Sequence, residues 1–178
     1  MPLEIMEKTL LISKETIHAK VKELADQLSS DYKGTEPVFI GILNGAVFFF
    51  ADIVREVSIS VKIDFIRAAS YGSRMESSGK IQLTKDVELS VKGKPVILVE
   101  DIIDTGRTIS HIVKSLEAKG PESIRICALI NKLERREATI QVDYFGFQIE
   151  EGFIVGYGLD YDEKYRQFPD IYSLCART

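Results

Sequence analysis

The sequence is short of the residues that build disulfide-rich and zinc-binding proteins. Its 178 residues include no tryptophan, two cysteines and two histidines. Cys127 lies inside an apolar run and Cys175 near the end of the chain, so we expect no disulfide framework, and a reducing cytoplasm fits. His18 and His111 fall in predicted helices without companion ligands, and we assign neither to a metal site.

Long apolar runs and an excess of positive charge are missing as well. No stretch approaches the ~20 consecutive apolar residues of a membrane span. The first residues, MPLEIMEKTLLIS, lack the basic start and apolar core of a signal peptide. The formal net charge of −4 argues against a general basic surface for nucleic acid or anionic membrane. We therefore expect neither as a partner, and any polyanion must be bound by local groups.

The residues that are present form one α/β pattern. Hydrophobic residues make up 45% and charged residues 28% of the chain, which suits one domain over residues 1–178. Helices are predicted over 44–57, over 108–120 and after Ser13, where apolar residues recur at helical spacing at Ile17, Val21, Leu24 and Leu28. Strands are predicted at 38–43, 59–66, 94–101, 123–130, 139–146 and 153–158. The alternation predicts a mainly parallel sheet flanked by helices, with ligands at the carboxyl ends of its strands.

Residues 68–86 show little periodicity and are rich in serine, glycine and charge. A structureless segment of this length inside a compact domain is uncommon, and active-site lids are a usual reason for one. The composition fits an ordinary exposed hairpin equally well. Both readings, a mobile lid and a hairpin, stay open at this point.

The string VEDIIDTGRT, residues 99–108, concentrates acidic residues where a buried strand ends. Glu100, Asp101 and Asp104 need a cation, hydroxyl donors or a proton to compensate their burial. Gly106 allows a tight turn, after which backbone amides at the start of a helix form an anion cradle. The turn TGRT alone would fit an ordinary capped helix, but the whole string favours a site that binds phosphate, sugar and metal together.

The longer string VILVEDIIDTGRT closely resembles the phosphoribosyl diphosphate signature of type I phosphoribosyltransferases, and in particular that of hypoxanthine-guanine phosphoribosyltransferases. GILNGAVFFFADIVR (41–55) resembles the family's pyrophosphate loop and first helix, and ASYG (69–72) the start of its lid. ALINKLERR (128–136) resembles its purine-contact strand, and FIVGYGLDYDEKYRQFPDI (153–171) its hood and metal-site segment. The resemblance implies the type I fold, a parallel sheet core with a small hood formed by the terminal segments.

The resemblance also implies roles for the acidic string. Glu100 and Asp101 would bind the ribose hydroxyls of phosphoribosyl diphosphate and, directly or through water, Mg²⁺. Asp104 would be the general base near the five-membered ring of the purine. The 5′-phosphate would be held by backbone amides and hydroxyls of Thr105, Gly106, Arg107 and Thr108.

Three further groups of residues follow from the same resemblance. In the base pocket, Lys132 would donate to the purine 6-oxo group and Phe153 would stack on the base, with Ile154 at the base edge. Asp160 would lie beside the purine and help to hold a second Mg²⁺. The pyrophosphate would meet Arg166 and the loop residues Leu43, Asn44 and Gly45. Ser70 and Tyr71 would belong to the lid.

Some of these residues have simpler readings when taken alone. Lys132 stands next to the charged residues 134–136, as in a solvated turn, and Phe153 fits an ordinary core position. Asn44 stands where the family often has Lys, and Asn131 where Asp is common. We expect the backbone of GILNG to bind pyrophosphate, with the peptide between residues 43 and 44 strained, a cis bond being one form of this.

The activity that the resemblance implies is purine salvage. A 5-phosphoribosyl group would pass from phosphoribosyl diphosphate to hypoxanthine or guanine, giving IMP or GMP and pyrophosphate, in a homodimer or homotetramer. One alternative of another class shares the fold: an RNA-binding regulator of pyrimidine-operon attenuation, in which Arg135 and Arg136 would belong to a small basic patch.

Overall fold

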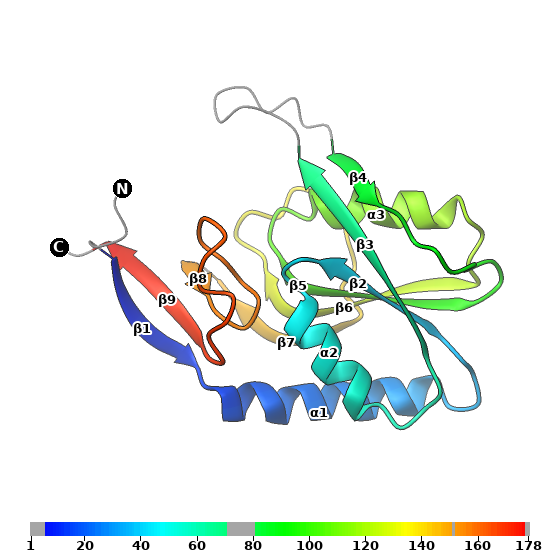
Figure 1. Ribbon diagram of the computed structural model, residues 1–178, viewed down its shortest axis with the longest axis horizontal. Coiled ribbons are helices and arrows are strands. Elements are labelled where there is room, and N and C mark those ends of the chain that lie inside the picture. Colours follow the sequence, from blue (N-terminus) through cyan, green and yellow to red (C-terminus); the bar gives the residue numbers. More distant parts are fainter. Residues whose placement is uncertain (1–5, 71–80, 151, 177–178) are drawn as a thin grey trace.

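The computed structural model describes residues 6–70, 81–150 and 152–176. Its helices and strands alternate along most of the chain, as the sequence predicts (Figure 1). The helices are α1 (Lys14–Asp31), α2 (Val47–Glu56) and α3 (Arg107–Glu117). The strands are β1 (Met6–Ile12), β2 (Val38–Leu43), β3 (Lys62–Ser70), β4 (Ile81–Lys85), β5 (Pro95–Ile103), β6 (Ser123–Lys132), β7 (Tyr144–Ile149), β8 (Phe153–Val155) and β9 (Ile171–Ala176).

The larger sheet has six strands in the order β4-β3-β2-β5-β6-β7. All neighbouring strands run parallel except β3 and β4, which are antiparallel. The central strands β2, β5 and β6 are almost entirely buried, as expected of parallel strands covered on both faces. The predicted mainly parallel α/β sheet is confirmed.

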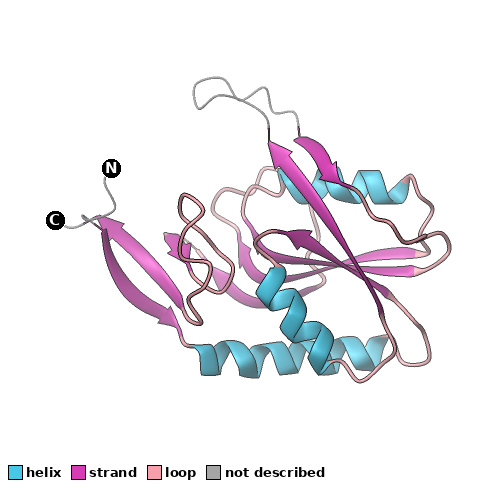
Figure 2. Ribbon diagram, viewed as in Figure 1, coloured by secondary structure: helices cyan, strands magenta, loops and turns pink. Residues whose placement is uncertain are grey.

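Helices cover both faces of this sheet (Figure 2), and alternate residues of each strand divide between them. Phe39 and Ile97 belong to the core under α1 and α2, where Phe49 packs. Their neighbours Ile40 and Leu98 belong to the core under α3. Strands buried on both faces leave their carboxyl ends as the place where polar ligands can reach the sheet.

The start of α1 follows from local sequence. The Ser13 side chain accepts a hydrogen bond from the Thr16 amide and caps the helix. The buried face of α1 consists of Ile17, Val21, Leu24, Ala25 and Leu28. The helix predicted from the spacing of four of these residues is confirmed.

Three strands have no counterpart in the sequence prediction, namely β1, β4 and β9. β1 and β9 pair antiparallel and, with β8, form a three-stranded sheet that brings the two ends of the chain together (Figure 1). The strand predicted at 139–146 is wrong in its first half. β7 begins only at Tyr144. Just before it, the Asp143 carboxylate accepts from the Ile126 amide and pairs with Arg125, and these side-chain contacts fix the irregular segment to β6.

The segment 68–86 is not structureless over its whole length. β3 extends to Ser70 and pairs antiparallel with β4, so both ends of the segment are strands. Tyr71 and the rest of the predicted lid up to residue 80 lie outside the described residues. Within the described ranges, no helix has the length and apolar character needed to cross a membrane.

Candidate active site

The sequence-predicted residues gather at one edge of the six-stranded sheet. β2, β5 and β6 are parallel, so their carboxyl ends meet there. β2 ends at Leu43, the acidic string ends β5, and Lys132 ends β6. The ladder between β5 and β6 continues to the pair Ile103 and Asn131. The fold thus places the three motifs of the sequence side by side.

Glu100 and Asp101 form a buried acidic pair, with relative exposures of 8% and 7%. One oxygen of Glu100 accepts from the Asp101 amide at 3.1 Å, and one of Asp101 from the Ile102 amide at 2.9 Å. Burial, together with the charge of Asp101, raises the pKa of Glu100 well above its ordinary value. Burial also raises the pKa of Asp101, which the charge of Arg166 partly offsets. A cation or sugar hydroxyls would compensate this pair.

The segment predicted to bind the 5′-phosphate, residues 104–108, leads from β5 into α3 around a pocket of about 140 Å³ and is called the phosphate loop below. Glu100, Asp104, Thr105 and Thr108 are among the residues that line this pocket. Gly106 has φ of 80°, and a Cβ atom there would lie 2.8 Å from the Ile140 side chain. Only glycine suits both the positive φ and the lack of space for a Cβ atom. The turn that it allows places the loop amides at the start of α3.

Of the carboxylates in the acidic string, that of Asp104 has a buried oxygen that accepts no hydrogen bond in the described part of the chain. Its Oδ2 lies 3.3 Å from Arg135 Nη1. Its Oδ1 is buried and has no hydrogen-bond partner among the described residues. A buried oxygen without a donor calls for a functional explanation, and a proton from a bound ligand would satisfy it.

The segment predicted to bind pyrophosphate, residues 43–46, packs closely against the acidic pair and is called the pyrophosphate loop below. The peptide bond between Leu43 and Asn44 is cis, one of the forms predicted for this loop. A Cβ atom at Gly45 would lie only 2.0 Å from an oxygen of Asp101. A Cβ atom at Gly158 would lie equally close to the Gly45 carbonyl. Asn44 itself is exposed, so its side chain is free to meet a ligand.

The burial of Lys132 and Phe153 is the opposite of what their local sequence suggests, which is an exposed lysine and a buried phenylalanine. Lys132 is only 7% exposed, and its ammonium donates to the Gly152 carbonyl at 3.0 Å and lies 3.3 Å from Glu134. Phe153 is 47% exposed, with its neighbour Ile154 buried. A buried cation next to an exposed aromatic ring is an arrangement that can bind a flat polar base.

Asp160 and Arg166 form an ion pair at 2.8 Å, and Arg166 also donates to the Gly158 carbonyl. The second oxygen of Asp160 accepts from the Glu163 amide. The described residues include no group of three or more His, Cys, Asp or Glu side chains arranged to hold a metal ion. Glu100, Asp101 and Asp160 therefore do not form a ready ligand set, and a cation would need ligands from water or substrate.

Arg136 and Tyr157 have structural roles in this site that are not predicted above. Arg136 donates to the backbone at the ends of both β5 and β6. The Tyr157 hydroxyl donates to Asp52 at 2.7 Å, which joins the segment after β8 to α2. The run of charge in LERR was the only signal for Arg136, and nothing in the sequence indicates the Tyr157 contact.

Comparison with known proteins agrees with this geometry. A family model described as "Phosphoribosyl transferase domain" matches residues 13–162. The chain belongs to the phosphoribosyltransferase family. It is 43% identical over 162 residues to a Bacillus subtilis hypoxanthine-guanine phosphoribosyltransferase, which covers 91% of this chain and 90% of the relative. It is 41% identical over 164 residues to an Escherichia coli hypoxanthine phosphoribosyltransferase, covering 91% and 92%.

Solved structures of phosphoribosyltransferases share the same architecture. A hypoxanthine-guanine phosphoribosyltransferase from Bacillus anthracis superposes with a TM-score of 0.89 at 45% identity, covering 94% of this chain and 99% of that one. A Trypanosoma cruzi hypoxanthine phosphoribosyl transferase gives 0.89 at 34% identity, covering 98% and 94%. These matches confirm the resemblance to hypoxanthine-guanine phosphoribosyltransferases and the type I phosphoribosyltransferase fold.

Proposed function

We propose that this protein transfers the 5-phosphoribosyl group from phosphoribosyl diphosphate to hypoxanthine or guanine, giving IMP or GMP and pyrophosphate. The main support for this proposal is that the phosphate loop and the buried Lys132 lie at the same edge of the sheet. The names of the relatives at 41–43% identity support it. In the reaction a purine ring nitrogen bonds to C1 of the sugar as the bond to pyrophosphate breaks.

The sugar donor would bind along the end of β5. Glu100 and Asp101 would accept from its ribose hydroxyls, which would offset the burial that raises the pKa of both side chains. The 5′-phosphate would occupy the pocket of the phosphate loop, held by amides of residues 105–108 and by the hydroxyls of Thr105 and Thr108. Arg166 and the pyrophosphate loop would meet the leaving pyrophosphate.

The purine would lie between β6 and β8. Lys132 would exchange its contact with the Gly152 carbonyl for the 6-oxo group, and Phe153 would stack on the ring. Asp104 would accept the proton that leaves the five-membered ring, at its unpaired oxygen. A proton acceptor and an oxo-specific donor on neighbouring strands fit a 6-oxopurine.

A divalent cation fits the donor set of this site. Glu100 and Asp101 present hard oxygen ligands whose burial is not compensated by cations at hydrogen-bond distance in the described residues. Mg²⁺ usually takes one or two carboxylates and completes its shell with water and substrate phosphates, which suits a pair better than a closed cage. Bound there, it would neutralise charge on the departing pyrophosphate. Asp160 would assist a second ion by releasing Arg166 to the pyrophosphate.

We assign the three-stranded sheet of β1, β9 and β8 to the hood of a single domain, and Ser70 and Tyr71 to its lid. The position of Tyr71 lies outside the described residues. Both cysteines are free thiols, Cys127 buried and Cys175 exposed, which suits a cytoplasmic enzyme.

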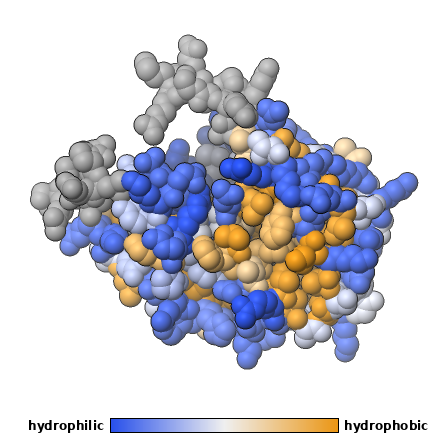
Figure 3. Space-filling model, viewed as in Figure 1, coloured by the Kyte–Doolittle hydropathy of each residue, from blue (hydrophilic) through white to orange (hydrophobic). Residues whose placement is uncertain are grey.

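We propose that the protein forms a homo-oligomer and that its subunits meet at an apolar surface over α2 and β3 (Figure 3). Val47 and Phe48 of α2 and Ile63 of β3 are large apolar residues that remain exposed. Phe65, two residues beyond Ile63, packs its ring against Phe50 of α2, so the exposed side chain of Ile63 lies on the α2 side of β3. Exposed apolar side chains gathered on one face are typical of protein interfaces.

Turnover measured on a panel of bases with phosphoribosyl diphosphate and Mg²⁺ tests the proposed function. We expect IMP or GMP from hypoxanthine or guanine, and little product from adenine or pyrimidines. An RNA gel shift at physiological salt tests the regulator alternative, for which Arg136 is poorly placed because four internal hydrogen bonds engage it. RNA binding without turnover on any purine would reject the proposal.

A further inference from the structure

Arg136 joins the ends of two neighbouring strands through one guanidinium group. Its Nε donates to the Asp104 carbonyl at 3.0 Å, and its Nη2 to the Ile103 carbonyl at 3.1 Å. On the other strand, Nη2 donates to the Lys132 carbonyl at 2.9 Å and to Asn131 Oδ1 at 2.6 Å. A planar guanidinium can reach two strands at once, which a lysine ammonium on a flexible stem cannot reproduce.

These contacts begin where the sheet itself stops. The β5–β6 ladder ends at the pair Ile103 and Asn131. Beyond it the chain enters the phosphate loop after one strand and a charged turn after the other, so strand pairing no longer fixes their separation. Arg136 supplies hydrogen bonds to the carbonyls of Asp104 and Lys132 at this point.

The segment that carries Arg136 also covers the phosphate loop. The amides of Glu137 and Ala138 both donate to the Thr105 carbonyl, at 3.0 and 3.1 Å. Glu137 also pairs with Arg107 at 2.5 Å. A Cβ atom at Gly106 would lie 3.2 Å from the Arg136 side chain. The phosphate loop and the covering segment, residues 133–140, are therefore joined by two backbone hydrogen bonds and an ion pair.

We propose that Arg136 is a positioning residue that holds the phosphate loop and the base-contact strand at a fixed separation, so that one nucleotide spans both. The inference rests on the proposed function and deepens it. Asn131, which departs from the family pattern, takes part through its side-chain oxygen, which serves as an acceptor without a charge. The separation matters because a 6-oxopurine nucleotide must reach from the phosphate loop to Lys132.

The test compares two ligands in Arg136→Lys. IMP spans the phosphate loop and the base pocket, whereas ribose 5-phosphate engages the phosphate loop without the base. We expect the dissociation constant of IMP to rise about 10- to 100-fold, the range for losing hydrogen bonds to a charged group. That of ribose 5-phosphate should change less than about threefold. A general structural defect would move both constants alike, which would overturn the proposal, as would an unchanged ratio.

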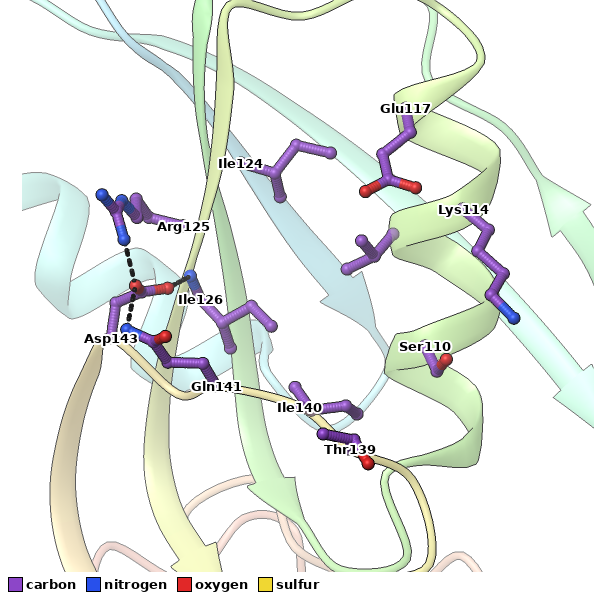
Figure 4. Close-up of a pocket in the computed structure, with 11 residues that line it drawn as sticks. Ser110, Lys114, Glu117, Ile124, Arg125, Ile126, Thr139, Ile140, Gln141 and Asp143 are labelled. Carbon is purple, nitrogen blue, oxygen red and sulfur yellow. Dashed lines mark hydrogen bonds and ion pairs between the residues drawn. The ribbon is translucent and has the colours of Figure 1, made fainter.

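The matched control is Arg125→Lys, at the opposite end of β6. Arg125 pairs with Asp143 beside a groove of about 350 Å³ between α3 and residues 139–143, away from the carboxyl ends of the strands (Figure 4). We expect the ratio of the two dissociation constants to keep its wild-type value in this variant.

If Arg136→Lys fails to fold, a second pair of variants tests the positioning role of Arg136. Asn131→Ala removes one acceptor and should weaken IMP selectively, whereas Asn131→Asp keeps an acceptor and should restore the wild-type ratio. Equal ratios in Asn131→Ala and Asn131→Asp would overturn the role of Arg136. Failure of the wild type to bind IMP would instead reject the proposed function, and this inference with it.

Discussion

At the scale of the residue, Asp104 offers the most direct test of chemistry. Asp104→Asn keeps the shape of the side chain but removes its ability to take a proton, so we expect turnover to fall by about 10²–10⁴-fold, the range for a positioned general base. Binding of phosphoribosyl diphosphate should persist, because the loop amides remain. Steady-state kinetics with calorimetric titration of the sugar donor measures both. The control is Asp31→Asn, an exposed aspartate at the end of α1, and unchanged turnover in Asp104→Asn would remove this residue from catalysis.

Lys132 is expected to set the preference for 6-oxopurines over adenine. An ammonium has three donors and no acceptor, so it can satisfy a 6-oxo group but not adenine's 6-amino group. Because Lys132 is buried, adenine's amino group would face the ammonium without accepting from it. The contact that a 6-oxo group supplies would then be lost, and discrimination can reach roughly 10⁴–10⁵-fold in kcat/KM. Lys132→Ala should lose most of this preference, whereas Lys114→Ala, on the exposed side of α3, should keep it. A preserved ratio in Lys132→Ala would contradict the assignment.

Glu100 is expected to lower the stability of the unliganded protein at neutral pH. Its pKa is raised by burial and by Asp101, so between the ordinary glutamate pKa and the raised value the folded state binds more protons than the unfolded state. Stability contributed by this group is therefore present at low pH and lost as pH rises through that window. Glu100→Gln should raise the melting temperature at pH 7 by about 2–4 °C or more, the shift for 1 kcal/mol in a chain of this size.

Melting curves of Glu100→Gln and wild type from pH 4 to 8 measure this effect. The difference should shrink toward the acid end, where Glu100 is protonated in both states. Activity should fall in the variant even as stability rises, because the ribose loses a carboxylate. If Glu100→Gln is less stable than the wild type at pH 7, the negative charge of Glu100 is already stabilised by other groups in the folded protein, and the prediction is wrong.

At the scale of the element, Asp64 joins β3 to the segment after β4. Its carboxylate is buried and accepts from the amides of Phe65, Glu88 and Leu89 at 2.7–2.8 Å, with Lys85 at 3.5 Å. Burial acts to raise its pKa, but these donors outweigh burial and hold the pKa below the ordinary value. The stability that it contributes is thus present at neutral pH and lost as pH falls through its folded pKa.

Replacing Asp64 by Asn should therefore loosen this edge of the sheet. The amide keeps one acceptor oxygen for three backbone donors, and leaving buried amides unpaired costs about 1–3 kcal/mol. Urea unfolding at pH 7 should show that loss in the free energy of unfolding. Asp86→Asn, at an exposed ion pair with Lys119, should lose less than about 1 kcal/mol. Equal losses in the two variants would mean that Asp64 has no special role.

At the scale of the whole molecule, the apolar surface over α2 and β3 makes a prediction about assembly. A charge at Ile63 would have to be desolvated in an interface on this surface, so Ile63→Glu should shift the protein toward monomers. Phe145→Glu places the same charge at an exposed position on the opposite edge strand, β7, and should leave at least a dimer. Sedimentation velocity separates these outcomes. An unchanged oligomer in Ile63→Glu would place the interface elsewhere.

Local patterns of residues are enough to predict the central architecture and the chemical groups of the site. Short continuous apolar runs bounded by polar turns favour strands buried on both faces, as β2, β5 and β6 are, and the spacing after Ser13 favours a helix with one buried face. The acidic string is predicted at the end of a strand because it follows a buried run, and β5 ends within it, at Ile103. Local patterns decide such features, since each depends on residues close together in the chain.

Which charged residues lie inside the site depends on contacts between segments that are far apart in the chain. Lys132 is buried and Phe153 exposed because a separate strand, β8, brings the Gly152 carbonyl to the lysine ammonium, 20 residues away in sequence. Arg136 reaches the Asp104 carbonyl, 32 residues away, although LERR reads locally as a solvated turn. β1 and β9 form a sheet only because the two ends of the chain meet. Burial and pairing between distant segments depend on the complete fold, and no local pattern carries that information.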